Sequence, residues 1–166
     1  MATVENLKEA FAGESQANRK YLAYAKKAEQ DGYPEVAKLF RAAAEAETVH
    51  AHAHLRVLGG VNDTDENLED AIAGEGHEFK SMYPGFVKEA EAEGSKAAVT
   101  SFERALAVEE IHHGLYTKAL DAVKSGSDLP SRDIYVCSVC GNTVYGEPPD
   151  VCPICNAKKE AFFQVK

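Results

Sequence analysis

The sequence predicts an all-α four-helix bundle followed by a small, metal-bound domain rich in β-strand. Three observations carry this prediction. Apolar residues recur at helical spacing, amid abundant Ala, Glu, Lys and Leu, over the first 126 of the 166 residues. A polar stretch containing proline follows at residues 127–133. Four cysteines and several β-favouring residues then occupy the remainder. We therefore expect a bundle over residues 1–126, a linker over 127–133 and a second domain over 134–166.

The first two helices are separated by a short turn. The first is expected over residues 3–30, and the Asp31-Gly32-Tyr33-Pro34 sequence ends it. Proline suits the first turn of a helix, so the second helix is expected to begin near Pro34. It should run to Leu58, where Gly59-Gly60 closes it.

The third and fourth helices are bounded in the same way. The third should begin near Thr64 or Asp65, either of which is a suitable N-cap. Pro84-Gly85 should kink or briefly break it before it continues over residues 88–93. The fourth should follow Ser95 as its cap and end at Gly126.

Polar residues lie in the middle of the apolar stripes of these helices. At about 100° per residue, the faces that carry Phe11, Phe40 and Ile72 also carry acids. Burying a lone carboxylate is costly unless it is paired, protonated or bound to a metal, and no Lys or Arg shares these positions. A cationic metal cluster satisfies them best. The residues concerned are Glu14, Glu47, His50, Glu75, Glu78 and Glu109.

The two halves of the predicted bundle resemble each other. Residues 46–50 match residues 108–112, so each half carries one Glu-x-x-His motif, Glu47 with His50 and Glu109 with His112. Positions three apart on a helix point the same way, and each motif therefore offers two ligands to one place. Glu110 with His113 is an alternative register in the fourth helix, and the internal match favours Glu109 with His112. This pattern is specific for a carboxylate-bridged dinuclear site.

The repeat also extends to the acids upstream of each motif. Glu14 precedes Glu47 by 33 residues, and Glu75 precedes Glu109 by 34. Glu78 has no counterpart in the first half, because position 17 is alanine. The predicted site is therefore asymmetric, with one extra acid.

The cysteines form two Cys-x-x-Cys knuckles, namely Cys137 with Cys140 and Cys152 with Cys155. Four thiolates suit Zn(II) or a single Fe, and the spacing does not choose between these metals. The domain is too short to fold on an apolar core, so metal binding should drive its folding.

Composition excludes several kinds of partner. The chain has 18 Lys+Arg against 27 Asp+Glu, a formal net charge of −9. An acidic chain is poorly suited to nucleic acid or to an anionic membrane surface. No apolar run approaches the length of a spanning helix, and the first residues do not have the pattern of a secretory signal. We expect a cytoplasmic protein.

The whole chain resembles the rubrerythrin family, in which a ferritin-like diiron bundle precedes a rubredoxin-like Fe(Cys)4 domain. The motifs that carry the resemblance include Glu47-Thr-Val-His50, Gly74-Glu75-Gly-His-Glu78, Met82-Tyr83-Pro84 and Glu109-Glu-Ile-His112, together with both knuckles. One departure is Asn156, where rubredoxin-type knuckles usually have glycine; asparagine tolerates the left-handed conformation.

The resemblance implies roles for the candidate ligands. Glu47 and Glu109 would bridge two irons, Glu14 would bind the first iron, and Glu75 with His112 would bind the second. Glu78 would bind the first iron in the oxidised state and give way to His50 on reduction, since carboxylates suit ferric and imidazoles ferrous iron. The tetrathiolate Cys137, Cys140, Cys152 and Cys155 would hold one further iron, with Zn as a possible substitute.

The resemblance further implies a peroxidase that reduces hydrogen peroxide to water. Tyr21 and Tyr83 could hydrogen-bond the ligands and supply protons. Electrons would come from an NAD(P)H-dependent reductase or a rubredoxin through the Fe(Cys)4 centre, because the chain has no Gly-rich dinucleotide motif. A homodimer is expected, head-to-tail or with exchanged helices. Ferroxidase activity and a non-enzymatic bundle with a zinc ribbon are the alternatives.

Overall fold

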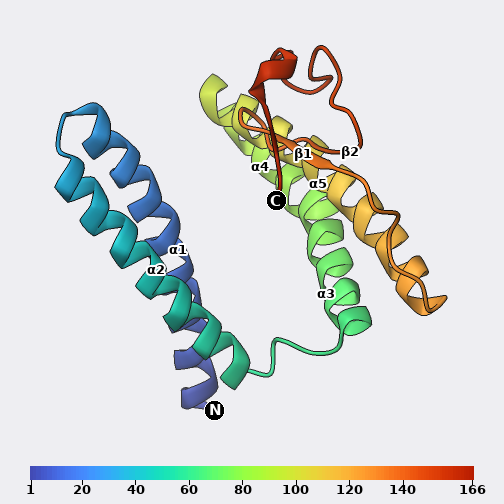
Figure 1. Cartoon of the computed structure of the whole chain (residues 1–166), viewed down its shortest axis with the longest axis horizontal. Helices are drawn as coiled ribbons and strands as arrows, with labels where there is room; N and C mark the ends of the chain where they lie inside the picture. Colours follow the sequence, from blue (N-terminus) through green and yellow to red (C-terminus); the bar gives the residue numbers. More distant parts are fainter. The chain divides into compact units, whose positions relative to one another are not determined.

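The computed structural model describes residues 1–166 and divides into two compact units, Met1–Asn62 and Asp63–Lys166. Four long helical segments are followed by a small domain that contains a three-stranded sheet and the four cysteines, which confirms the predicted fold class (Figure 1). The two units are described separately. No helix has both the length and the apolar character needed to cross a membrane.

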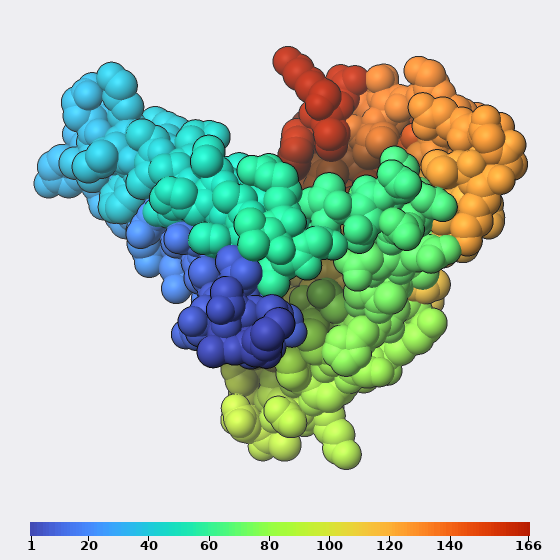
Figure 2. All heavy atoms as spheres, turned by 90° about the horizontal axis from the view of Figure 1, so that it is seen from below, coloured from blue at the N-terminus to red at the C-terminus, as the bar shows by residue number.

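The first unit is an antiparallel helical hairpin of α1 (Ala2–Gln30) and α2 (Pro34–Val57). Its N-terminus and the turn between its helices lie at opposite ends of the hairpin (Figure 2). Gly32 has a φ of 82°, which is the left-handed conformation that glycine adopts without steric cost. Pro34 follows in the first turn of α2, where its missing N–H costs nothing. The turn therefore forms as the sequence predicts.

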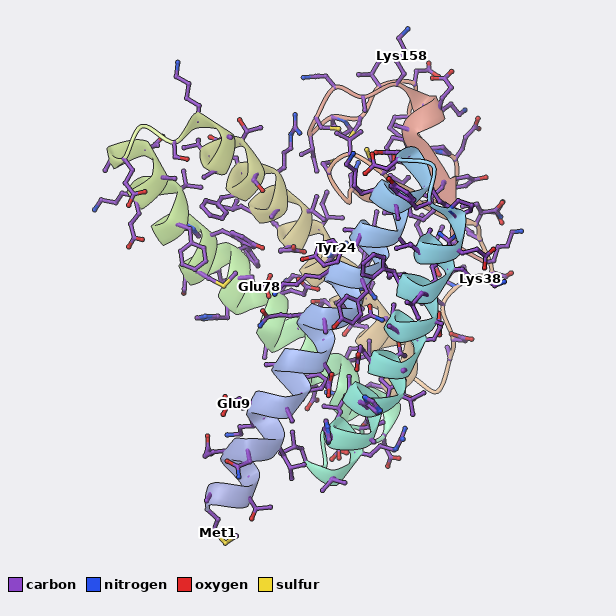
Figure 3. All side chains as sticks on the ribbon, turned by 90° about the vertical axis from the view of Figure 1, so that its left-hand side faces the viewer. Met1, Glu9, Tyr24, Lys38, Glu78 and Lys158 are labelled. Carbon is purple, nitrogen blue, oxygen red and sulfur yellow. The ribbon has the colours of Figure 1, made fainter.

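Small residues bring the two helices close together at the end nearest the turn. Ala25, Ala28 and Ala37 are buried there, and Phe40 packs against them. Tyr24 faces α2, and its ring meets Phe40 edge-on with 5.6 Å between centroids (Figure 3). Further along the hairpin the buried Asn18 donates from Nδ2 to the Ala44 carbonyl at 2.8 Å. These contacts fix the register of the two helices.

The second unit begins with α3 (Thr64–His77). The helix begins at Thr64, as predicted, but its N-cap is Asp63 and not Thr64 or Asp65, so the predicted cap was wrong. Asp63 and Glu66 form a capping box, in which the side chain of each residue accepts a hydrogen bond from the backbone N–H of the other. The first turn of the helix is therefore capped by Asp63 and needs no cap from Thr64. Helix α5 (Lys96–Lys124) follows Ser95 as its N-cap, as predicted.

The predicted break at Pro84 takes the form of a π-helical turn. This turn, η1 (Glu78–Met82), separates α3 from α4 (Tyr83–Ala92), and the Tyr83 N–H bonds to the Glu78 carbonyl. Proline cannot donate to the residue four positions back and its ring clashes there, so a wider turn before it is favourable. The π-helical turn therefore accommodates Pro84 without ending the helical segment.

The cysteine-bearing part is a three-stranded antiparallel sheet with strand order β2-β1-β3. The strands are β1 (Ile134–Cys137), β2 (Thr143–Tyr145) and β3 (Phe162–Gln164), and a short 3-10 helix η2 (Lys159–Ala161) precedes the last of them. Val136 pairs with both Thr143 and Phe163. No helix or strand covers residues 125–133, the region of the predicted linker, and the domain boundaries themselves stay a prediction.

Candidate metal centres

The hairpin α1–α2 brings three of the predicted ligands together. Glu14 from α1 and Glu47 and His50 from α2 each offer one ligand atom, all within 4.8 Å of one another. The Nδ1 atom of His50 lies 3.0 Å from Glu47 Oε2 and 3.8 Å from Glu14 Oε1. We refer to these three residues as the first cluster.

The second unit contains a cluster of the same composition. Glu75 from α3 and Glu109 and His112 from α5 offer ligand atoms that also lie within 4.8 Å of one another. The Nδ1 atom of His112 lies 2.7 Å from Glu109 Oε2 and 3.7 Å from Glu75 Oε1. These three residues are the second cluster. The internal repeat of the sequence thus corresponds to a repeat in local geometry, with one acid on the first helix of each pair and Glu-x-x-His on the second.

The acids of the second cluster disfavour one another's charge. The pKa of Glu75 is raised to about 7, mainly by burial and further by the negative charge of Glu109, a hydrogen bond with Glu109 and the charge of Glu78. The ionised form of Glu75 would be stabilised by a nearby cation, which replaces repulsion with attraction. The donor set of carboxylates with one imidazole fits iron.

Glu78 and Tyr83 flank the second cluster from the two ends of the π turn. Glu78 begins this turn, where α3 ends (Figure 3), and it is not one of the three clustered residues. Burial raises the pKa of Tyr83, and the charges of Glu78, Glu109 and Glu75 raise it further. Tyr83 therefore lies within electrostatic reach of all three acids. π-Helical turns often occur at functional sites.

The remaining candidates lie outside the two clusters. Tyr21 packs against Phe40, with 6.1 Å between ring centroids. Glu110 is exposed, and His113 meets the Phe79 ring edge-on at 5.3 Å. The structure therefore places Glu109 and His112, and not the alternative pair Glu110 and His113, in the second cluster.

The four cysteines converge in the sheet domain with sulfur atoms free of disulfide bonds. The Sγ atoms of Cys137 and Cys155 lie 3.7 Å apart, and those of Cys140 and Cys152 lie 3.6 Å apart. Four sulfurs bound tetrahedrally at about 2.3 Å lie about 3.8 Å from one another, so the spacing fits a single metal ion. Asn156 adopts a φ of 60°, which is the left-handed conformation expected for it.

Backbone amides favour a thiolate in the second knuckle. Burial alone would raise the pKa of the Cys152 thiol, but N–H groups of Cys155 and Ile154, together with the Cys155 and Cys140 thiols, lower it to about 6. The Asn142 side chain adds a contact from its Nδ2 atom to Cys152 Sγ at 3.7 Å. Metal binding requires deprotonated cysteine, so these donors prepare the site for its ion.

Both parts of the chain match known family models. The model described as rubrerythrin matches residues 5–120, and the model described as the rubredoxin-like domain of rubrerythrin matches residues 135–163. The chain belongs to the rubrerythrin family. Its cofactors are therefore those that the sequence predicts for a rubrerythrin, non-haem iron at a carboxylate and histidine site and iron at the four cysteines.

Relatives in this family match along nearly the whole chain. Rubrerythrin-2 of Clostridium acetobutylicum is 37% identical, over 96% of this chain and 95% of its own. Nigerythrin of Nitratidesulfovibrio vulgaris is 35% identical, over 97% of this chain and 85% of its own. Solved structures of nigerythrin in a mixed-valent state and in a fully reduced, all-ferrous state give TM-scores of 0.58 and 0.59 at 34% and 33% identity, each covering 98% of this chain and 86% of that chain.

One residue of the rubrerythrin site was not found from the sequence. The Thr143 Oγ1 atom lies 2.9 Å from His112 Nε2 and 3.1 Å from the Gly141 carbonyl oxygen. Thr143 follows the first knuckle in β2 and lies 31 positions after His112. No periodicity or motif connects two residues so far apart, and the sequence therefore contained no signal for this contact.

Proposed function

We propose that this protein is a non-haem diiron peroxidase that reduces hydrogen peroxide to water. Two ferrous ions at the carboxylate site would supply the two electrons required, and two protons complete the conversion of one peroxide into two waters. The observation that carries this proposal is the presence, in one chain, of two matched Glu, Glu and His clusters and a tetrathiolate site. Peroxide reduction is typical of the rubrerythrin family, to which the chain belongs.

The two clusters together would supply the ligands of the two-iron centre. Glu47 and Glu109 would be the bridging carboxylates, as the resemblance to rubrerythrins implies. Each also contacts the Nδ1 atom of the histidine three positions further on. Glu14 would complete the first cluster and Glu75 the second.

Protons could be held by groups beside the second cluster. Without a metal, Glu75 has a pKa raised to about 7 chiefly by burial, so near neutral pH it holds a proton that the binding of a cation would release. The phenol of Tyr83, with a pKa raised by burial and by neighbouring acids, stays protonated and can donate a hydrogen bond. Tyr21 would serve the first cluster in the same way, although its ring contacts with Phe40 also fit a packing role.

Glu78 and His50 are proposed to exchange as ligands of the first iron. Within its own hairpin, the ring of His50 is held through Nδ1 alone. The ring of His112 is held at both nitrogens. A less constrained imidazole is the better candidate for a ligand that binds in one oxidation state only, with Glu78 taking its place in the ferric state.

The tetrathiolate would be the electron inlet. Iron bound by Cys137, Cys140, Cys152 and Cys155 has an accessible one-electron step, whereas zinc has none. The donor would be an NAD(P)H-dependent reductase or a rubredoxin, since the chain has no dinucleotide-binding motif. Cysteines that bind a metal instead of pairing as disulfides are typical of a reducing compartment, which favours the cytoplasm.

We propose a homodimer, and a mixing experiment reports whether its helices are exchanged. One chain carries Glu47→Ala, the other carries Glu109→Ala, and the two are co-expressed with different tags. If the chains exchange helices, each site combines α1 and α2 of one chain with α3 and α5 of the other. Both substitutions then fall in one site of the mixed dimer and the second site is intact, so the mixed dimer should regain activity. A dimer without exchange has one defect in each site and stays inactive. Light scattering of the unmodified protein checks the dimer itself.

Anaerobic titration of the fully reduced protein with hydrogen peroxide tests the proposed activity. We expect one peroxide to be consumed for each pair of ferrous ions at the carboxylate site, with iron counted per chain. Ferroxidase activity is the second candidate, because Glu and Glu-x-x-His ligands of this kind hold paired irons in ferritin-like proteins generally. Net iron accumulation with dioxygen, and slow reaction with peroxide, would favour it. A colourless protein that holds only zinc after iron-replete, anaerobic expression would exclude the electron inlet.

A further inference from the structure

The imidazole of His112 is held at both of its nitrogen atoms. Nδ1 lies 2.7 Å from Glu109 Oε2, and Nε2 lies 2.9 Å from Thr143 Oγ1. The first contact spans three residues along α5, whereas the second reaches to β2 in the cysteine-bearing sheet. The ring is thus fixed between Glu109 of α5 and Thr143 of β2, two elements that belong to the same compact unit.

The direction of the hydrogen bond between His112 and Thr143 follows from where the single hydroxyl proton of Thr143 is donated. Its Oγ1 atom lies 3.1 Å from the carbonyl oxygen of Gly141, which can only accept. The hydroxyl therefore donates to Gly141 and accepts from His112, and the proton of a neutral imidazole must lie on Nε2. An ion bound by Glu75 and Glu109 would then take the lone pair of Nδ1. Without an ion, the 2.7 Å contact between Nδ1 and Glu109 Oε2 needs a proton of its own, which metal binding would displace.

The same hydroxyl ties the histidine to the first knuckle. Gly141 follows Cys140, and its N–H donates to the Cys137 carbonyl at 2.8 Å. The Cys137 N–H donates in turn to the Asn142 carbonyl at 2.9 Å. A methyl group added at Gly141 would meet Val108 of α5 at 3.7 Å, so the knuckle itself lies against the helix that carries His112. Two hydrogen bonds through Thr143 therefore connect the candidate ligand with the backbone of the tetrathiolate loop.

We propose that Thr143 is a positioning residue, whose hydroxyl accepts the Nε2 proton of His112 and so presents Nδ1 to the metal while linking that ligand to the first cysteine knuckle. This inference rests on the proposed metal centre. Outer hydrogen-bond partners of this kind orient ligating histidines, and their loss typically lowers metal affinity by about 10–100-fold.

Zinc loading of the intact chain tests the proposal without peroxide chemistry. Zn(II) is diamagnetic, so nitrogen-15 NMR of the loaded protein identifies which His112 nitrogen binds metal and which carries the proton. We expect metal on Nδ1 and a slowly exchanging proton on Nε2. Metal on Nε2 with a proton on Nδ1 would overturn the proposal in the unmodified protein, whatever any variant does.

Substitutions then isolate the hydroxyl. A cavity of about 340 Å³ lined by His112, Thr143 and apolar side chains adjoins the contact, so an alanine there would let water replace the hydroxyl. Valine keeps the volume of threonine and removes the polar atom. Thr143→Val should weaken Zn(II) binding at the carboxylate site by about 10–100-fold in calorimetry of protein whose tetrathiolate is already filled. It should also accelerate exchange of the Nε2 proton, and Thr143→Ser should restore both properties.

Thr117→Val is the matched control. Thr117 lies on α5 and its hydroxyl donates to the His113 carbonyl at 2.7 Å, so this change removes a comparable hydrogen bond without touching His112. It should leave both readouts unchanged. Unmodified protein that binds no metal at the carboxylate site would refute the proposed function. If the unmodified protein binds metal there and Thr143→Val has the same Zn(II) affinity and the same Nε2 proton exchange, only the role of Thr143 would be refuted.

Discussion

Glu75 and Glu109 face each other from α3 and α5, close enough to share a hydrogen bond in the metal-free protein. The two acids lie on different helices of one unit, and each is within reach of the His112 ring. Two carboxylates so placed cannot both ionise without cost unless a cation lies between them. This pair therefore links the stability of the folded unit to pH and to metal.

The metal-free protein should lose stability as the pH rises. The pKa of Glu75 is about 7 in the folded state, chiefly because of burial, against an ordinary value of 4.5. Below pH 4.5 the carboxyl is protonated in both states. Between pH 4.5 and 7 the unfolded state releases its proton first and is favoured, and above pH 7 the full cost is present. Urea unfolding of chelated protein should show that Glu75→Gln gains on the order of 1–3 kcal/mol over the parent at pH 8 and little at pH 4.5.

The control for this pH dependence is Glu89→Gln, which neutralises an exposed acid on α4. Its stability should follow the parent across the whole range. A Glu75→Gln variant that follows the parent as well would mean that Glu75 ionises normally in the folded chain.

The register of the second Glu-x-x-His motif is open to a direct test. Glu109→Ala and His112→Ala each remove a residue of the second cluster and should weaken ferrous iron binding by more than the about 10–100-fold typical of outer-shell losses. Glu110→Ala is the matched control, because Glu110 is the exposed neighbour on the same helix. Equal losses for Glu109→Ala and Glu110→Ala, measured by iron titration, would contradict the assignment.

Cys137→Ser should separate the two metal sites functionally. The substitution removes one of four buried or half-buried thiolates, so the visible absorption of ferric tetrathiolate and steady turnover with a reductase should both be lost. A single reaction of peroxide with the reduced carboxylate site should persist, as stopped-flow absorption would show. Ser138→Ala changes the exposed neighbour and should leave both properties intact. Loss of the single reaction in Cys137→Ser would show that the sites do not have separate roles.

Glu78→Ala should weaken iron binding in the oxidised state more than in the reduced state. The reason is that the proposed exchange uses Glu78 as a ligand of ferric iron and His50 as a ligand of ferrous iron. Chelator competition under oxidising and under strictly anaerobic, reducing conditions measures the two affinities. Equal weakening in both states would argue against ligand exchange.

Much of the candidate site could be predicted because its information is local. Residues three or four apart on a helix share a face whatever surrounds them, so the pairs Glu47 with His50 and Glu109 with His112 follow from spacing alone. The same holds for the cysteine knuckles, whose spacing predicts a shared ion. The turn at Gly32 and Pro34 likewise depends only on the backbone preferences of those residues.

Other features required the tertiary structure. The proline at position 84 predicts a disturbance of the helix, but whether a kink, a break or a π turn results depends on how the flanking helix packs. The cap of α3 did not require it: Asp63 is followed three residues later by Glu66, a capping-box pattern that is readable in the sequence and that the prediction of Thr64 or Asp65 missed.

By itself, the sequence determined the helical periodicity, the acids on the apolar faces, both Glu-x-x-His motifs and the four-cysteine site. Only the tertiary structure decided that Thr143 meets His112, that Glu75 and Glu109 lie close enough to raise a pKa, and that Glu78 lies on a π turn. The physical reason is that periodicity and spacing act within a few residues, whereas these relationships join segments brought together by packing.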